Sequence, residues 1–293
     1  MIHVPVPLRL AWVAFKRFHA HSGPDRAAAV AYYALLSLLP LLVFAISLGM
    51  AIAGSFDVAY NATVFLLQGV VVHMDTQTME TLRRFVEQSV RFKLLSILVL
   101  AWTARRSFNA LFSALETVFE VPGRGFAGGN LVSLSMVIVT GVGMLLSLTL
   151  TTLRATFEGI FERYAPQMML DTTTVLHRLL DVVFTNLLPI VIAVVFFFTV
   201  YRIMPRRTVT TRDAFIGALL ATILWESAKS AFAFYVRNLT HYAGMYGTLE
   251  GLIVLALWLE LSVSIILYCG EVVAVLIRKR NGEIRASDIP TAV

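Results

Sequence analysis

Long apolar runs, separated by short charged segments, dominate the pattern of residues along the chain. A helix needs about 20 mostly apolar residues to cross the hydrocarbon core of a bilayer. Three intervals reach this length without a charged residue, namely 27–56, 125–153 and 182–201. Three more reach it only if charged residues lie inside the helix. The pattern predicts an all-α polytopic bundle in one membrane domain, residues 1–293, with six spans over about 28–53, 94–119, 127–153, 182–201, 214–236 and 248–277.

Other segments on the predicted outer side are too short or too polar to be confident spans. Residues 58–74 carry no charge but are short, so we expect a re-entrant or interfacial segment. Between residues 79 and 90, apolar residues recur at helical spacing against Arg and Glu, which predicts an amphipathic helix on the membrane surface. Residues 154–181 have a similar pattern, and we expect a second surface helix there.

The composition supports an integral membrane protein and suggests its orientation. Apolar residues make up 58% of the chain and charged residues only 14%, whereas a soluble domain carries roughly 25% charged residues. The net charge of +6 agrees with the enrichment of Lys and Arg in cytoplasmic loops. Counted over alternate loops, 15 Lys and Arg residues lie on the side of the N-terminus and 8 on the other. We therefore expect both termini in the cytoplasm.

Polar and charged residues recur inside three of the predicted spans. Glu226 and Lys229 are three residues apart and so share a helix face. The other candidates lie on two further spans: Arg105, Arg106, Asn109, Glu260 and Glu271. A charge at bilayer depth costs on the order of 2.5–3.5 kcal/mol, so such residues usually pair or line a polar cavity. The pattern leaves two alternatives: a cavity that binds an anionic or zwitterionic substrate or relays protons, and an ion-pair network that only fixes helix register.

Three stretches of the chain resemble the YihY/BrkB family of bacterial inner-membrane proteins. They are "DRAAAVAYYALLSLLPLLVF" at 25–44, "AWTARRSFNALFSALETVFEV" at 101–121, and a long stretch from 202 to 276 that contains "LWESAK". Carried over to this sequence, the resemblance singles out Arg106, Asn109, Glu226, Lys229 and Glu271, together with Asp25, Tyr32, Ser37, Pro40, Pro205, Asp213, Gly217, Trp225, Tyr246, Gly247 and Trp258. The sequence departs from the family pattern at Glu260.

The resemblance implies six helices in the bacterial cytoplasmic membrane but no settled activity, since members carry labels of ribonuclease, serum-resistance factor and envelope-lipid transport. A ribonuclease needs a metal site or an acid/base pair that RNA can reach. The six histidines are scattered over both predicted sides, and the sequence contains no phosphate-binding loop of the GxxxxGK[ST] type. We therefore expect a protein that is not an enzyme, with no metal, no cofactor and no nucleic-acid partner.

The hypothesis that fits these observations best is a transporter or translocator of an anionic lipid or envelope-related solute. Arg106 and Lys229 would contact phosphate, and Glu226 would hold Lys229 in position. Membrane lipids are then the expected partners. The alternative is a non-transporting scaffold or partner subunit in envelope maintenance, which would bind envelope proteins through its surface helices.

Overall fold

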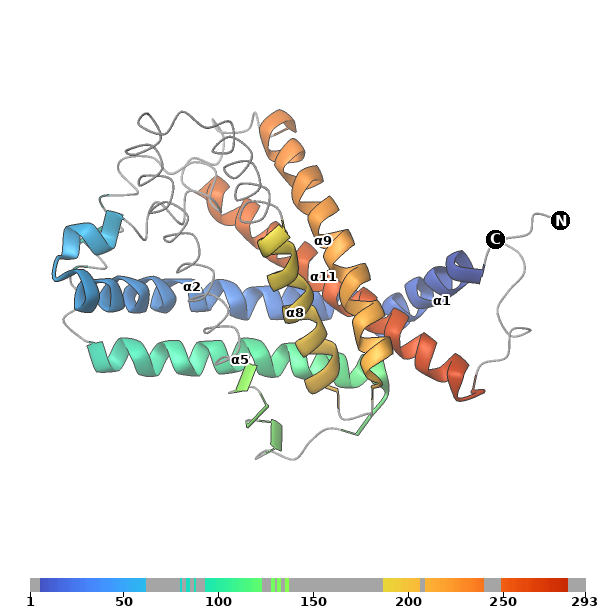
Figure 1. The fold of residues 1–293 in the computed structure, drawn as a ribbon. Coiled ribbons are helices and arrows are strands. Elements are labelled where there is room, and N and C mark those ends of the chain that lie inside the picture. Colours follow the sequence, from blue (N-terminus) through green and yellow to red (C-terminus); the bar gives the residue numbers. More distant parts are fainter. Residues whose placement is uncertain are drawn as a thin grey trace, which may run out of the picture.

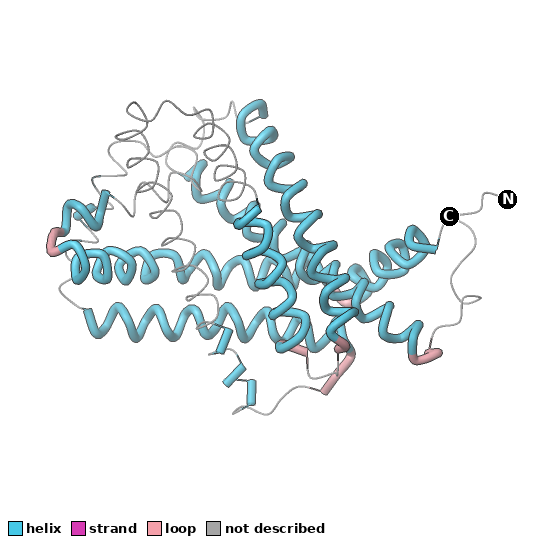
Figure 2. The backbone as a smooth tube through the Cα atoms, viewed as in Figure 1, coloured by secondary structure: helices cyan, strands magenta, loops and turns pink. Residues whose placement is uncertain are grey.

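The described part of the protein is built from helices, drawn as a ribbon in Figure 1 and by element type in Figure 2. The structure is a computed structural model, and it describes residues 6–61, 80, 83–84, 87, 93–122, 128–129, 131–132, 135–136, 187–205, 209–239 and 249–283. No strand occurs within these residues, which agrees with the predicted all-α class. The principal helices are α1 (Val6–Ala20), α2 (Gly23–Ala53), α5 (Lys93–Phe119), α8 (Leu188–Ile203), α9 (Thr211–Leu239) and α11 (Leu249–Arg280).

Helix α11 lies at the centre of the described bundle. It contacts α1, α2, α5 and α9, while α8 packs against α9. Helices α2 and α5 run side by side in opposite directions, and α9 and α11 are inclined to that pair (Figure 1). In the described residues α5 and α9 do not pack along one another, and each packs on α11 instead. Helix α1 extends past the end of the α2–α5 pair, beside the last part of α11 (Figure 1).

The helices coincide with the predicted spans over most of the described chain. Helices α2, α5, α9 and α11 begin and end within five residues of the predicted bounds. Helix α8 covers the described part of the predicted span 182–201. Most of the span 127–153, the whole of 154–181, and all but a few residues of the outer segments 58–74 and 79–90 lie outside the described residues. The sequence analysis did not predict α1.

Two of the described helices are long and apolar enough to cross a membrane. They contain the intervals Thr211–Val236 and Leu252–Arg280, on α9 and α11. Helix α8 contains a shorter apolar interval, Pro189–Ile203. At about 1.5 Å per residue, the 32 residues of α11 are longer than the roughly 30 Å hydrocarbon core requires. That all six predicted spans cross the membrane stays a prediction.

The main core forms where α5, α8 and α11 meet. Leu115 and Phe119 on α5, Val200 and Tyr201 on α8, and Leu267 on α11 are fully buried. The Tyr201 hydroxyl donates a hydrogen bond to the Ile266 carbonyl at 3.0 Å, so the phenol is buried with its polar atom satisfied. This core fixes the position of α11, on which the polar sites described below depend.

Close packing of α9 onto α11 requires a glycine at position 217. A Cβ atom added to Gly217 would lie 2.3 Å from Cγ2 of Val273 and 3.3 Å from the ring of Tyr201. Val273 and Tyr201 are both fully buried, so neither can move aside easily. The glycine that the family resemblance singled out therefore has a packing role.

The start of α9 is tied to the end of α11. Thr210 precedes the helix and its hydroxyl accepts from the backbone N–H of Asp213 at 3.3 Å, as in a capping box. The Thr210 hydroxyl also bonds to the Asp213 carboxylate at 2.7 Å, and Arg280 on the last turn of α11 pairs with that carboxylate. Thr210 therefore caps the start of α9, and Asp213, another residue of the family pattern, connects this cap to the end of α11.

Candidate functional site

The ion pair predicted on the span 214–236 is present about halfway along α9. The Lys229 Nζ atom lies 2.8 Å from Oε2 of Glu226. Lys229 also lies 4.6 Å from the ring centroid of Trp225, and the Trp225 indole donates a 3.3 Å hydrogen bond to Ser262 on α11. We call Glu226 and Lys229 the mid-helix pair; it lies beside the contact between α9 and α11.

The side chains of the mid-helix pair use only part of their hydrogen-bonding capacity. The Oε1 atom of Glu226 is buried and has no hydrogen-bond partner among the described residues, although buried polar atoms in native proteins nearly always have one. The side chain of Lys229 is 38% exposed, so its remaining N–H donors can be reached. The carboxylate thus has a free acceptor next to an accessible cation and an aromatic ring.

Within the described residues, no hydrogen bond or ion pair joins the mid-helix pair to the other predicted polar residues of the spans. Arg106 is exposed and its guanidinium lies 4.9 Å from the ring centroid of Trp102, on the same helix. Asn109 is exposed, and Arg105 and Glu260 are half-buried. Because α5 and α9 each pack on α11 and not along one another, the described contacts do not form a belt of charges across the three helices.

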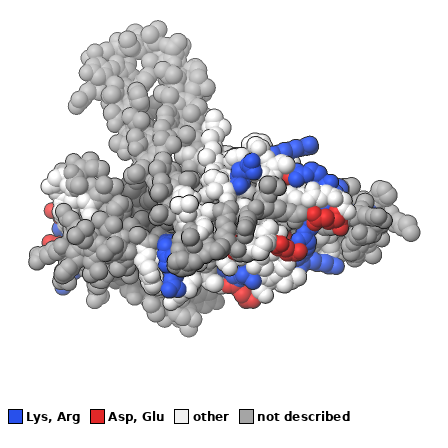
Figure 3. Space-filling model, turned by 90° about the horizontal axis from the view of Figure 1, so that it is seen from below, with Lys and Arg blue, Asp and Glu red and all other residues white. Residues whose placement is uncertain are grey.

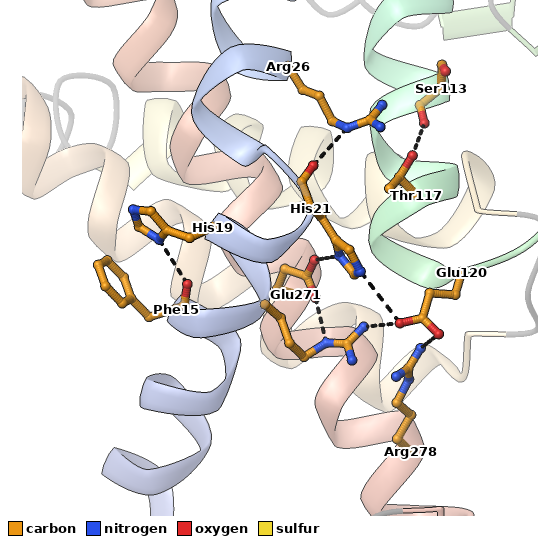
Figure 4. A network of polar contacts seen from close by, with 10 residues as sticks. Phe15, His19, His21, Arg26, Ser113, Thr117, Glu120, Glu271 and Arg278 are labelled. Carbon is orange, nitrogen blue, oxygen red and sulfur yellow. Dashed lines mark hydrogen bonds and ion pairs between the residues drawn. The ribbon is translucent and has the colours of Figure 1, made fainter. Parts of the chain in front are cut away.

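A second and denser group of charges joins α1, α5 and α11 at the end of the bundle, and Figure 4 shows it from close by. We call it the end cluster. Its carboxylates lie between the cationic side chains, and Figure 4 shows His21 directed toward both carboxylates. It consists of Arg17, His21, Glu120, Glu271 and Arg278.

Glu271 is the buried centre of the end cluster. Its side chain is fully buried and accepts a 3.0 Å bond from Nε of Arg17. Its second oxygen lies 2.5 Å from Nδ1 of His21, so the imidazole carries a hydrogen on that nitrogen when the carboxylate is ionised. The sequence analysis proposed Glu271 as a substrate ligand, and the structure places it against residues of the N-terminal segment.

Glu120 joins the same cluster from the end of α5. Its carboxylate lies 2.6 Å from Nη2 of Arg17, 2.5 Å from Nη2 of Arg278 and 3.6 Å from Nε2 of His21. The hydrogen bond from Arg278, followed by that from Arg17, lowers the pKa of Glu120 to about 2, against the opposing effect of partial burial. Glu120 is therefore ionised over the physiological pH range.

The backbone at Glu120 is unusual for a residue with a side chain. Its φ of 50° lies in the left-handed region, where glycine is the common residue after a helix. The N–H groups of Glu120 and Val121 bond to the carbonyls of Thr117 and Glu116, as in a Schellman motif. A left-handed residue other than glycine costs roughly 1–2 kcal/mol. The ion pairs with Arg17 and Arg278 offset this cost.

A break between α1 and α2 positions His21. Ser22 has a φ of 52°, so the chain cannot continue as one helix, and Arg26 donates a 2.9 Å bond to the carbonyl of His21. Gly23 follows in close contact with Phe18, because an added Cβ would lie 2.3 Å from that ring. The break turns His21 and Arg17 toward the ends of α5 and α11. With two arginines and two glutamates, the end cluster is electrically balanced when His21 is neutral.

The comparisons with known proteins agree with the sequence resemblance. The family model described as virulence factor BrkB matches residues 14–290. The chain belongs to the BrkB family. Because relatives in this family are named membrane proteins and two described helices are long enough to span, this BrkB-family chain is a membrane protein.

Relatives of different length match this BrkB-family chain. The ribonuclease-like protein YfkH of Bacillus subtilis (strain 168) is 27% identical over 276 residues, which cover 91% of this chain and 94% of the relative. A UPF0761 membrane protein of Azotobacter vinelandii is 26% identical and matched over 63% of its own length, and one of Nitrosospira multiformis is 26% identical and matched over 58%. This chain therefore spans about three fifths of the length of these two UPF0761 relatives. No solved structure matches.

The remaining residues of the BrkB pattern occupy varied positions. Trp225 and Trp258 have ring centroids 6.1 Å apart where α9 meets α11. Asp25 and Tyr32 are exposed on α2, and the Ser37 hydroxyl donates to the Ala34 carbonyl at 2.6 Å. Pro40 lies within α2 and Pro205 is buried after α8, while Tyr246 and Gly247 lie outside the described residues. The described residues contain no group of three His, Cys, Asp or Glu side chains that could hold a metal ion.

Sequence reasoning missed four of the five residues of the end cluster. Arg17 and Arg278 entered the prediction only through the count of basic residues, His21 only as one of six scattered histidines, and Glu120 was given no role. Their partners are 99 (120 − 21) to 254 residues away in the chain, so no local spacing connects them. The one available signal was Glu271, whose charge inside an apolar run requires a partner from elsewhere.

Proposed function

We propose that this BrkB-family protein moves an anionic lipid or envelope-related solute across or out of the bacterial cytoplasmic membrane, without catalysing a chemical reaction. The observation that carries the proposal is the half-satisfied mid-helix pair on α9. Among the described residues nothing donates to Oε1 of Glu226, and the ammonium group of Lys229 is accessible, so the pair can bind a headgroup that offers both a donor and a phosphate. A phosphate that contacts Lys229 would leave Glu226 to hold that lysine in place.

The orientation belongs to the same proposal. The excess of Lys and Arg on the side of the N-terminus supports a cytoplasmic position for both termini. The end cluster would then close the cytoplasmic end of the bundle, and the mid-helix pair would lie deeper in the membrane. Opening of the cytoplasmic end would require α1 to separate from α5 or α11.

The name of the Bacillus relative contains the word ribonuclease, but the contacts in this chain do not favour such an activity. Both carboxylates near His21 are occupied by guanidinium groups, and Glu271 is fully buried. Glu120, whose pKa is lowered to about 2, is a poor base, and the buried carboxylate of Glu271 is out of reach of a substrate. We therefore propose membrane lipids, and not nucleic acid, as partners.

A liposome assay with matched variants tests the transport proposal. Purified protein should accelerate the exchange of a fluorescent phosphatidylglycerol between leaflets, measured by dithionite reduction of the outer leaflet. Lys229→Gln removes a charge-assisted contact of about 1.5–3 kcal/mol, so the rate should fall roughly tenfold or more. Ser227→Ala, on the exposed face of the same helix, should leave the rate unchanged.

Two results would contradict the proposal. One is a lack of acceleration by the wild-type protein with a panel of anionic and zwitterionic lipids, which would favour the scaffold alternative. The other is equal activity of Lys229→Gln and wild type at the same level of inserted protein. Size-exclusion profiles of both variants distinguish a folding defect from a loss of transport.

A further inference from the structure

The outward face of α1 is an aromatic and basic stripe that the functions discussed so far do not use. Trp12, Phe15, Lys16 and His19 are exposed and occupy positions i, i+3, i+4 and i+7 of the helix, so they lie on one helix face. The opposite face is packed: Ala14 is fully buried against Val272 and Val275 of α11. We call the four exposed residues the α1 stripe.

The aromatic rings of the α1 stripe contact one another. The centroids of Trp12 and Phe15 are 5.7 Å apart in a stacked arrangement, and those of Phe15 and His19 are 4.4 Å apart. The Nζ atom of Lys16 lies 5.6 Å from the Trp12 ring. Trp12 and Phe15 remain 38% and 44% exposed. The result is a continuous apolar surface with a cation at its edge, in place of scattered exposed rings.

The charges on helix α1 itself have one sign. Helix α1 contains Arg9, Lys16 and Arg17 but no acidic residue. Figure 3 shows basic and acidic side chains together toward this end of the molecule. Glu271 and Glu120 do not oppose this charge, because Arg17, Arg278 and His21 already surround them.

The position of α1 is fixed relative to a helix that is long enough to span the membrane. The Tyr268 hydroxyl donates a 3.2 Å bond to the carbonyl of Ala11, and Arg17 pairs with Glu271. Helix α1 also lies past the end of the α2–α5 pair (Figure 1). A short helix held at the end of a membrane bundle, with aromatic rings and lysine outward, has the composition of a helix at a membrane surface.

We propose that the α1 stripe lies in the headgroup layer and binds anionic lipid headgroups. The rings of Trp12 and Phe15 would enter the boundary between headgroups and acyl chains, and Lys16 would contact lipid phosphate. The exposed apolar surface of the stripe and its positive charge both favour binding to the membrane, and the protein is already in the bilayer. This surface is separate from the mid-helix pair, and the inference does not depend on transport.

Fluorescence quenching by spin-labelled lipids tests the position of Trp12. Full-length protein in lipid nanodiscs is compared with Trp12→Phe, and the difference between the two emission spectra isolates Trp12 among the four tryptophans. Because an interfacial helix lies about 5–10 Å into the boundary region, a nitroxide on the headgroup should quench the Trp12 emission more than one at the twelfth acyl carbon. Aqueous iodide should quench it weakly.

Each other outcome overturns the proposal. Strong quenching by iodide with none by the headgroup nitroxide places α1 in water. Strong quenching by the mid-chain nitroxide places it in the bilayer core. Protection from all three quenchers, with a doubled particle mass, would mean that a second copy of the chain covers the stripe.

A second measurement tests the preference for anionic lipid. Adding phosphatidylglycerol to the nanodiscs should increase quenching of Trp12 by a headgroup nitroxide on that lipid. Lys16→Gln should remove the increase, and Lys16→Arg should restore it, because both Lys and Arg bind phosphate. An equal response of wild type and Lys16→Gln would show that charge on α1 plays no part.

Discussion

The buried carboxylate of Glu271 allows the strongest test of how the bundle is held together. Glu271→Gln keeps the shape of the side chain but removes its charge. Its oxygens accept bonds from Arg17 at 3.0 Å and from His21 at 2.5 Å. A glutamine has one acceptor oxygen, so one of these bonds must be lost and an N–H group must then face a donor.

The size of the effect follows from the contacts that remain. Loss of a hydrogen bond to a charged group costs about 1.5–3 kcal/mol, and breaking a buried ion pair costs about 3–5 kcal/mol. Arg17 still has Glu120 at 2.6 Å, which reduces the penalty for leaving its charge unpaired. We therefore expect a loss of about 2–3 kcal/mol in Glu271→Gln, toward the lower end of these ranges.

Thermal unfolding in detergent measures this loss. The readout is the fraction of protein that stays monodisperse after heating. A change of this size should lower the midpoint by on the order of 5 °C. Glu260→Gln is the matched control, since Glu260 is on the same helix, is half-buried and makes no ion pair within the described residues. Equal midpoints for Glu271→Gln and Glu260→Gln would refute the role given to the end cluster.

Two further predictions follow from other contacts. The lowered pKa of Glu120, about 2, means that its contribution to stability is complete above its ordinary pKa of 4.5 and is lost as the pH falls toward 2. Between pH 6 and pH 3 the thermal midpoint of wild type should fall more than that of Glu120→Gln, and parallel curves would contradict the assignment. Gly217→Ala should destabilise by about 1–3 kcal/mol because its Cβ would overlap Val273. The added substitution Val273→Ala should recover part of the lost midpoint, and no recovery would place the strain elsewhere.

The long helices were predictable because lipid imposes a minimum length on apolar runs. The mid-helix pair was predictable because residues three apart on a helix must be neighbours. Neither rule reaches the end cluster, where Arg17 meets Glu271 across 254 residues of sequence. Helix α1 also escaped prediction, since its three Lys and Arg residues hide an apolar face that is satisfied only by α11.

The charged residues inside α11 illustrate a limit of periodicity. Helical spacing places Glu260 and Glu271 on similar faces of one helix, yet Glu271 is fully buried while Glu260 is half-buried. Which neighbour covers each turn of a long helix depends on how the other helices cross it. Glu120 shows a second limit. The left-handed position after a helix usually holds glycine, and the glutamate found there is explained by ion pairs with arginines distant in the sequence.

The end cluster also constrains the order in which the chain can assemble. Arg17 and His21 leave the ribosome some 250 residues before Glu271 and Arg278. Domains begin to fold during synthesis at roughly 5–20 residues per second, so α1 must wait for its final partner while the intervening helices are made. During that interval a surface that holds α1 at the membrane would keep it close to the place where α11 arrives. Helix α1 is therefore made long before the contacts that fix its position.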